Sequence, residues 1–555
     1  MSDAAGWTAV LTEQGVAAAD VAVAKASAEE MARQIGALAS DPTAGIDLAA
    51  FQALLRAEAG ATASPTAEPS TPASPAPASP TPAGGAAVAS IETMARDLAR
   101  GAVSAVELTE HCLAALRRAG ETLNAVARLE PEAALDQARA ADARLAICRR
   151  DGETAPPLLG IPLAHKDLYA RAGWLLEAGS AILRGNRATT TATAITALDR
   201  AGAVDLGRLN TVEFALGPDG RNAHTGPVRN PWDTARVTGG SSSGSGAAVA
   251  AGAVPGALGS DTGGSIRLPA AACGVVGIKP TAGLIGRTGI WPLSGALDTA
   301  GPLAATVRDA ALMVQAMAGH DPGDPQSVDR PPVDLMAGIE DGLRGLRVGI
   351  AEQPFLDGVD EEVARAFADA LTLMSAEGAT TKRVSLPGIE TANLLNVAMI
   401  NAEAAAQHRA WLATRAGDYG NETLVRILSG LFLPSTAYLA AAHGRAPLLR
   451  AALAGPFAEV DVIATPVWPF DPPLIEDDDP AAYRARTRLI GQGTRPFNYL
   501  GLPAVVLPAA LSARGLPIAL QLVGRPYEEA LVLRAARGVE RARAFSAEHR
   551  PAIAA

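Results

Sequence analysis

Two serine-rich turns and one lysine are the residues of this 555-residue chain best suited to chemistry. The turns lie at Gly239–Gly246 and Asp261–Ser265, and Lys166 ends the apolar segment that begins at Leu158. A buried lysine favours its neutral amine, which can act as a general base, and a base can activate a serine hydroxyl as a nucleophile. Successive backbone amides in the second turn can form a nest for a developing oxyanion; they belong to Thr262, Gly263, Gly264 and Ser265.

Other interpretations of these turns fit less well. Gly-Ser tracts are typical of flexible linkers, but this one leads directly into the small-residue run 247–251, which favours a closely packed helix. Ser242 matches a G-x-S-x-G nucleophile elbow, although the residues before it make a poor strand. Asp261-Thr-Gly matches an aspartic protease half-site with Asp298 as its mate, yet the chain shows no internal duplication.

Taken together, the motifs resemble the amidase signature family of Ser-Ser-Lys amide hydrolases. The resemblance covers about residues 90–545 and rests on five segments: Gly160-Ile-Pro with Lys166-Asp167, Arg229-Asn-Pro-Trp-Asp before Gly239-Gly-Ser-Ser, Asp261-Thr-Gly-Gly-Ser265-Ile-Arg-Leu-Pro, Cys273-Gly-Val-Val-Gly-Ile-Lys-Pro-Thr, and Leu297-Asp-Thr-Ala-Gly-Pro302. Ser243 departs from the family pattern, where glycine is more usual, and leaves open which serine of the run acts as the relay.

The resemblance assigns roles to individual residues. Lys166 would be the base, Ser241 the relay and Ser265 the nucleophile, with the oxyanion on the amides of residues 262–265. Gly239, Gly240, Trp291 and Leu293 would border the substrate. The implied reaction is hydrolysis of a non-peptide carbon–nitrogen bond in a linear amide or carbamate, without a cofactor.

An alternative is a glutaminase-type A subunit of an amidotransferase, which supplies ammonia to a partner. Such subunits resemble one another in a Ser-Arg-Tyr-Asp-Gly-Val-Arg-Tyr-Gly-like segment that handles glutamine, where this chain has Asn401-Ala-Glu-Ala-Ala-Ala-Gln-His408-Arg. We therefore favour a free-standing hydrolase at this point. A non-catalytic binding protein is a third interpretation, and Lys166, Ser241 and Ser265 argue against it.

The pattern of short apolar runs and helical periodicities predicts an α/β fold. The resemblance implies a large mixed sheet flanked by helices on both faces. We expect a helical N-terminal extension over residues 1–60, a Pro/Ala/Ser-rich linker over 61–87 that makes this extension a separate appendage, and a catalytic domain over 88–550. Residues 497–508 and 516–524 are expected to form the closing hairpin of the sheet.

Composition limits the class of protein. A net charge of −11 argues against a general nucleic-acid surface, and three cysteines, too few for a disulfide framework, favour a reducing, cytoplasmic compartment. The spacing of Cys and His suggests no metal site, and the chain shows no apolar run near 18 residues that would span a membrane. We expect a small-molecule amide or carbamate as the binding partner, and a homodimer stays open.

Overall fold

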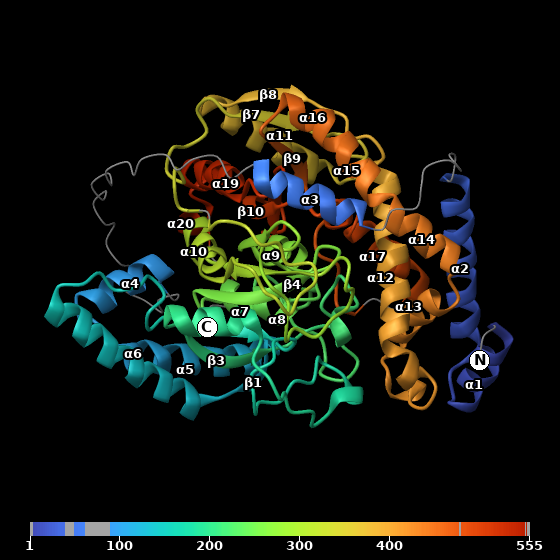
Figure 1. Cartoon of the computed structure of the whole chain (residues 1–555), viewed down its shortest axis with the longest axis horizontal. Coiled ribbons are helices and arrows are strands. Elements are labelled where there is room, and N and C mark those ends of the chain that lie inside the picture. The colour runs from blue at the N-terminus through green and yellow to red at the C-terminus, as the bar shows by residue number, and fades with distance from the viewer. Residues whose placement is uncertain are drawn as a thin grey trace.

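The computed structural model describes residues 4–38, 49–61, 89–332, 334–476, 479–549 and 551. Within them, eleven strands form one mixed sheet in the order β1-β3-β2-β4-β6-β5-β10-β11-β9-β7-β8, with helices on both faces (Figure 1). The predicted fold class is confirmed. The strands are β1 (Val126–Leu129), β2 (Pro162–Lys166), β3 (Val204–Leu209), β4 (Gly256–Asp261), β5 (Val276–Lys279), β6 (Thr299–Ala304), β7 (Arg347–Ile350), β8 (Thr380–Arg383), β9 (Val462–Pro466), β10 (Ala504–Leu511) and β11 (Pro517–Val523).

The helices follow the predicted periodicities over much of the body. Ser104 caps the helix that begins at Ala105: its hydroxyl accepts from the Glu107 amide (3.1 Å), and the Glu107 carboxylate accepts from the Ser104 amide (2.8 Å). The helices are α1 (Ala4–Glu13), α2 (Ala18–Leu38), α3 (Ala50–Ala61), α4 (Ile91–Ala99), α5 (Ala105–Leu123), α6 (Pro131–Asp151), α7 (Thr193–Ala201), α8 (Ser243–Ala250), α9 (Arg267–Cys273), α10 (Val307–Met317), α11 (Glu361–Ala376), α12 (Ile389–Leu412), α13 (Asn421–Leu431), α14 (Ser435–His443), α15 (Arg445–Ala454), α16 (Pro456–Glu459), α17 (Pro480–Ile490), α18 (Arg495–Tyr499), α19 (Glu529–Arg543) and α20 (Phe545–Glu548).

The centre of the sheet brings the two predicted catalytic segments together. Strand β2 runs parallel to both β3 and β4, and all three strands are buried along their whole length. Parallel neighbours end at the same edge of a sheet, so Lys166 at the end of β2 and Asp261 at the end of β4 reach one edge. The turn that carries Ser265 begins there.

The N-terminal helices pack on the body rather than apart from it. Helix α2 lies along α13 and also touches α12 and α14, with Val21, Met31 and Ile35 buried (Figure 1). Helix α3 places the Phe51 ring under the guanidinium of Arg445, 3.6 Å from the ring centroid. The expectation of a separate appendage does not match these contacts. Residues 62–88, which contain nearly all of the predicted linker, lie outside the described residues, so the domain boundaries stay a prediction.

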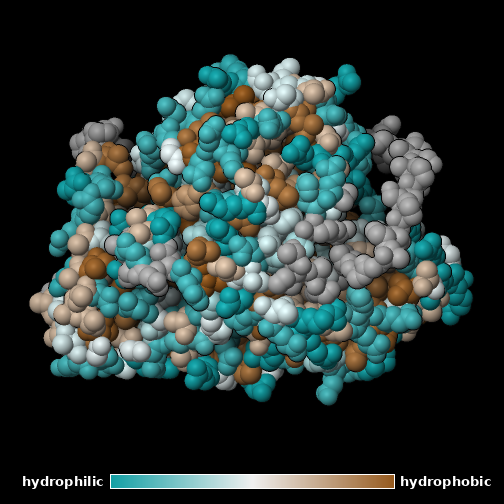
Figure 2. Space-filling model, turned by 180° about the vertical axis from the view of Figure 1, so that it is seen from behind, coloured by the Kyte–Doolittle hydropathy of each residue, from teal (hydrophilic) through white to brown (hydrophobic). Residues whose placement is uncertain are grey.

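The surface and the cysteines add two observations. On the face shown in Figure 2, hydrophilic side chains predominate and apolar ones are scattered. Cys112, Cys148 and Cys273 are all free and buried. In the described part of the chain, no single helix has the length and apolarity to cross a membrane; residues 421–431 and 435–459 meet that test only as a pair, bent by 89°.

Candidate active site

Lys166 lies completely buried at the edge of the sheet, against two hydroxyls. Its Nζ is 2.7 Å from Ser241 Oγ and 2.9 Å from Ser260 Oγ. Burial lowers the pKa of Lys166 from its ordinary 10.5 to about 7, although the nearby carboxylates of Asp298 and Asp261 favour the charged amine. A large part of the amine is therefore neutral near neutral pH, as a base requires.

Ser241 is held by its own backbone just before α8. The Gly240–Ser241 peptide is cis, and the Ser241 carbonyl accepts hydrogen bonds from Thr211 Oγ1 (2.9 Å) and from the Val212 amide (3.2 Å). A Cβ added at position 240 would lie 2.8 Å from the Gly220 nitrogen, so only glycine fits this close approach. The glycines of the first turn thus allow the backbone contacts that aim Ser241 at the lysine.

Ser265 occupies the turn between β4 and α9 and faces a cavity. Its side chain is mostly buried, and its carbonyl accepts from the Ser242 amide (3.2 Å), which ties the two serine turns together. Among the described residues, Ser265 Oγ forms no hydrogen bond with Ser241. The structure therefore brings Lys166 into contact with Ser241 and places Ser265 in the adjoining turn. A proton relay through Ser241 would need a further hydrogen bond between Ser241 and Ser265 when substrate binds.

The amides of the second turn differ in what they can still bind. The Gly264 amide already donates to Asp261 Oδ1 (2.7 Å). The amides of Gly263 and Ser265 have no acceptor among the described residues, while the Gly263 carbonyl is fixed by the Thr494 hydroxyl (2.7 Å). The Thr262 amide likewise has no acceptor among the described residues, so Thr262, Gly263 and Ser265 can still donate to a substrate oxygen, whereas the Gly264 amide has a structural partner.

A buried ion pair fixes the shape of this turn. Arg267 donates through Nε to Asp261 Oδ2 (2.9 Å) and through Nη2 to Asp261 Oδ1 (3.0 Å), and both side chains are fully buried. Burial alone would raise the pKa of Asp261, but Arg267 holds it well below its usual range. Asn498 Nδ2 also donates to the carboxylate (2.8 Å), and Gln521 accepts from Arg267 (2.8 Å). The sequence reasoning missed this pair, although Arg267 stood in one of its motifs.

Two further polar residues near Lys166 were not predicted as parts of the site. Ser260, on β4, is the lysine's second hydroxyl neighbour, and its amide donates to the Ser242 hydroxyl (3.3 Å). Asp298 entered the sequence analysis as the mate of a protease half-site and as part of a family-like segment, without a role in the site. It instead accepts from Thr262 Oγ1 (2.5 Å) and from the Leu293 amide (2.8 Å), and burial raises its pKa. Asp298 thus connects the Asp261–Ser265 turn to Leu293, which lines the cavity that Ser265 faces.

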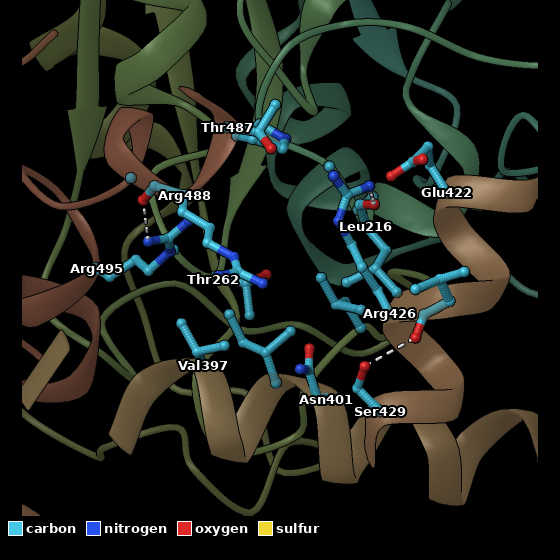
Figure 3. A pocket seen from close by; sticks show the side chains of 18 of the residues that line it. Leu216, Thr262, Val397, Asn401, Glu422, Arg426, Ser429, Thr487, Arg488 and Arg495 are labelled. Carbon is cyan, nitrogen blue, oxygen red and sulfur yellow. Dashed lines mark hydrogen bonds between the residues drawn. The ribbon is translucent and has the colours of Figure 1, made fainter. Parts of the chain in front are cut away.

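The cavity that Ser265 faces measures about 220 Å³ (Figure 3). Its walls come from α2, α12, α13 and α17, and Leu293 lines it together with Thr262 and Gly263. Gly239, Gly240 and Trp291, the other predicted substrate neighbours, are not among its lining residues. The Trp291 ring packs instead against Phe214 (centroids 5.9 Å apart) and Trp411 (6.0 Å), in an aromatic cluster that the low aromatic content gave no reason to expect.

His165, beside the lysine, is a structural residue. It is buried, and desolvation lowers its pKa to about 3 despite the nearby Asp205, whose Oδ1 is 3.8 Å from His165 Nε2. A ring whose pKa is lowered this far is neutral near neutral pH, which favours a structural role over proton transfer.

Comparisons with known proteins agree with this geometry. Residues 107–533 match a family model described as Amidase. The A subunit of glutamyl-tRNA(Gln) amidotransferase from Chloroflexus aggregans is 41% identical over 468 residues, which cover 80% of this chain and 94% of the relative. A chain solved in work on a vestigial protein complex and the origins of an s-triazine catabolic enzyme superposes with a TM-score of 0.77 at 34% identity, covering 82% of this chain and 98% of that one. A peptide amidase bound to the competitive inhibitor chymostatin superposes with a TM-score of 0.72 at 31% identity. The match covers 83% of this chain and 98% of that one.

Proposed function

Because the chain belongs to the amidase signature family, we propose that it cleaves the carbon–nitrogen bond of a non-peptide amide or carbamate through an acyl-enzyme on Ser265. The observation that carries this proposal is a buried lysine with a pKa of about 7, in hydrogen-bond contact with Ser241 beside the turn of Ser265. These groups are the base, relay and nucleophile that amide cleavage needs without a histidine.

Each proton has a route in this arrangement. Neutral Lys166 accepts the proton of Ser241, which takes that of Ser265 as the Ser265 oxygen attacks the carbonyl carbon. The oxyanion then accepts hydrogen bonds from the amides of Gly263 and Ser265, each worth about 3 kcal/mol in the transition state. Protonated Lys166 returns its proton through Ser241 to the leaving nitrogen, and water hydrolyses the ester that remains.

Ser260 orients the base in this mechanism. A neutral amine has two N–H donors and one lone pair, and the lone pair must point at the Ser241 hydroxyl. By donating one N–H to Ser260 Oγ, 2.9 Å away, Lys166 is held with its lone pair free for Ser241. Ser260 is therefore a positioning residue.

Active-site labelling tests the proposal. A fluorophosphonate probe should modify wild-type protein on Ser265, as located by mass spectrometry of the labelled peptide, and should leave Ser265→Ala unmodified. Ser241→Ala and Lys166→Met should fold and label far more slowly. Labelling of another residue, or equal labelling of Ser265→Ala, would remove Ser265 from the mechanism.

The comparisons favour the second candidate, an ammonia-supplying component of an amidotransferase, over the free-standing hydrolase that the sequence analysis preferred. Curated relatives about 40% identical over most of their length are named as the A subunit of such an enzyme, a name that implies further subunits. Release of ammonia from glutamine that depends on Ser265, together with co-purification of a second chain, would select this candidate. Hydrolysis of simple amides by the purified chain, with glutamine inert, would select the free-standing enzyme.

A further inference from the structure

The cavity in front of Ser265 is strongly basic although the chain as a whole is acidic. Four arginines line it, against one carboxylate among the described lining residues, Glu422. The arginines are Arg426 on α13, Arg484 and Arg488 on α17, and Arg495 at the start of α18. The chain carries a net charge of −11, so this local excess of positive charge is a property of the site.

Only part of this charge is neutralised within the protein. Arg484 forms an ion pair with Glu422, with Nη2 2.9 Å from Oε1. Arg426 donates to the backbone carbonyl of Leu216 (3.3 Å), and Arg495 donates to the carbonyl of Arg488 (3.0 Å). Within the described residues, neither Arg426 nor Arg495 has a carboxylate partner. Figure 3 shows the two side chains entering the cavity from different walls.

Arg495 also lies directly beside the nucleophile turn. A Cβ added to Gly263 would come within 3.2 Å of its Cγ, so the stem of the arginine covers the oxyanion turn. Burial and, to a smaller extent, the positive charge of Arg426 together lower the pKa of Arg495 to about 10. Two half-buried guanidiniums that repel each other gain stability from an anion placed between them.

We propose that the substrate of Ser265 is a small amide that carries a carboxylate, bound by Arg426 and Arg495. Guanidinium groups bind carboxylates through paired, charge-assisted hydrogen bonds. The remaining walls include Leu216, Val397 and Ile400, which suit a short aliphatic spacer between the carboxylate and the scissile carbonyl. This inference rests on the proposed acyl-enzyme function and adds the substrate class to it.

Glutamine satisfies only part of this description. It carries a carboxylate, but also an ammonium that needs an acceptor of its own. Glu422, the carboxylate of the cavity, is already paired with Arg484. The described lining therefore offers the ammonium of an amino acid amide no unpaired carboxylate, which favours a carboxylate-bearing amide without that group.

A matched pair of covalent probes tests the inference without knowledge of the natural substrate. Both are ethyl alkylphosphonofluoridates with a three-carbon arm; one arm ends in a carboxylate, the other in an isopropyl group of similar shape. Ser265 Oγ forms a bond to phosphorus, fluoride leaves, and the serine proton passes through Ser241 to Lys166. The second-order labelling rates are compared for wild type, Arg426→Gln and Arg495→Gln. Arg383→Gln is the control, because it removes the same charge from an exposed position on β8.

In wild type the carboxylate probe should react at least tenfold faster, and this preference should shrink as salt is added. Arg426→Gln and Arg495→Gln should each lower the preference about tenfold or more, mainly by slowing the carboxylate probe, whereas Arg383→Gln should leave it unchanged. An equal or higher rate for the isopropyl probe in wild type, or a preference unaltered in both cavity variants, would overturn the inference while the acyl-enzyme stands. Failure of both probes to label Ser265 would overturn the acyl-enzyme and the inference together.

Discussion

The pH dependence of Ser265 acylation follows from the burial of Lys166. With a pKa of about 7, the amine is about one tenth neutral at pH 6 and about nine tenths neutral at pH 8. If the neutral amine is the base, the labelling rate of Ser265 should rise about tenfold across that interval and then level. A lysine of ordinary pKa would instead give a rate that keeps rising beyond pH 9.

Substitution of the lysine isolates its contribution. Lys166→Met keeps a buried side chain of similar length and removes the base, so labelling should fall about 10²–10⁴-fold and lose its dependence on pH between 6 and 8. Lys279→Met is the matched control. Lys279 is also fully buried with its pKa lowered to about 7, by burial and by Arg267, but it donates to the Pro280 carbonyl rather than contacting the serines.

The same pKa predicts a stability difference with a definite sign. The folded pKa of Lys166 is lower than its unfolded value of 10.5. Its contribution to the free energy of unfolding is therefore complete above pH 10.5 and is lost as the pH falls from there through about 7. Between pH 9 and pH 6, wild type should lose about 2–3 kcal/mol of unfolding free energy relative to Lys166→Met. Chemical denaturation of both proteins at each pH measures this difference.

Two results would refute the reasoning about Lys166. One is a labelling rate that stays flat from pH 6 to pH 8 in wild type. The other is a Lys166→Met protein that labels as fast as Lys279→Met. Asp298→Asn gives an internal check, because loss of the carboxylate that favours the charged amine should move the wild-type inflection to lower pH.

Three further perturbations address the surroundings of the site. Ser260→Ala should lower the acylation rate about tenfold without changing the labelled residue, and an unchanged rate would mean that Lys166 needs no second hydroxyl. Arg267→Met should destabilise the fold by about 3–5 kcal/mol, because Asp261 stays buried without its partner; an unfolding midpoint equal to wild type would contradict that cost. Deleting residues 1–88 removes Met31 and the rest of α2 from the cavity wall, so KM should rise several-fold, whereas unchanged kinetic constants would restore the idea of an appendage.

Local chemistry explains why the sequence predicted the centre of the site. Glycine-rich turns, a lysine at the end of an apolar run and a small-residue helix are all properties of short segments. The structure brings Lys166 against Ser241 although 75 residues separate them, as the catalytic proposal requires.

Long-range pairing explains what the sequence did not predict. The hairpin of β10 and β11 forms as expected, but it lies inside the sheet between β5 and β9 rather than closing it. Strand order depends on contacts between distant segments, which periodicity does not report. For the same reason, nothing near Arg426 or Arg495 in the sequence indicated that α13 and α18 would meet Ser265 in one cavity.

Three buried basic residues, Lys166, Arg267 and Lys279, lie near the end of the central strands. Their contacts, rather than their pKa values alone, distinguish their roles. Arg267 forms a bidentate ion pair with the Asp261 carboxylate, so it supports the turn. Lys279 and Lys166 have pKa values lowered alike to about 7, yet the first donates to a carbonyl, which cannot give up a proton. Lys166 alone of these three touches hydroxyls, one of which adjoins the turn of Ser265, the proposed nucleophile. A neutral buried amine becomes a base only where a transferable proton lies within hydrogen-bond distance.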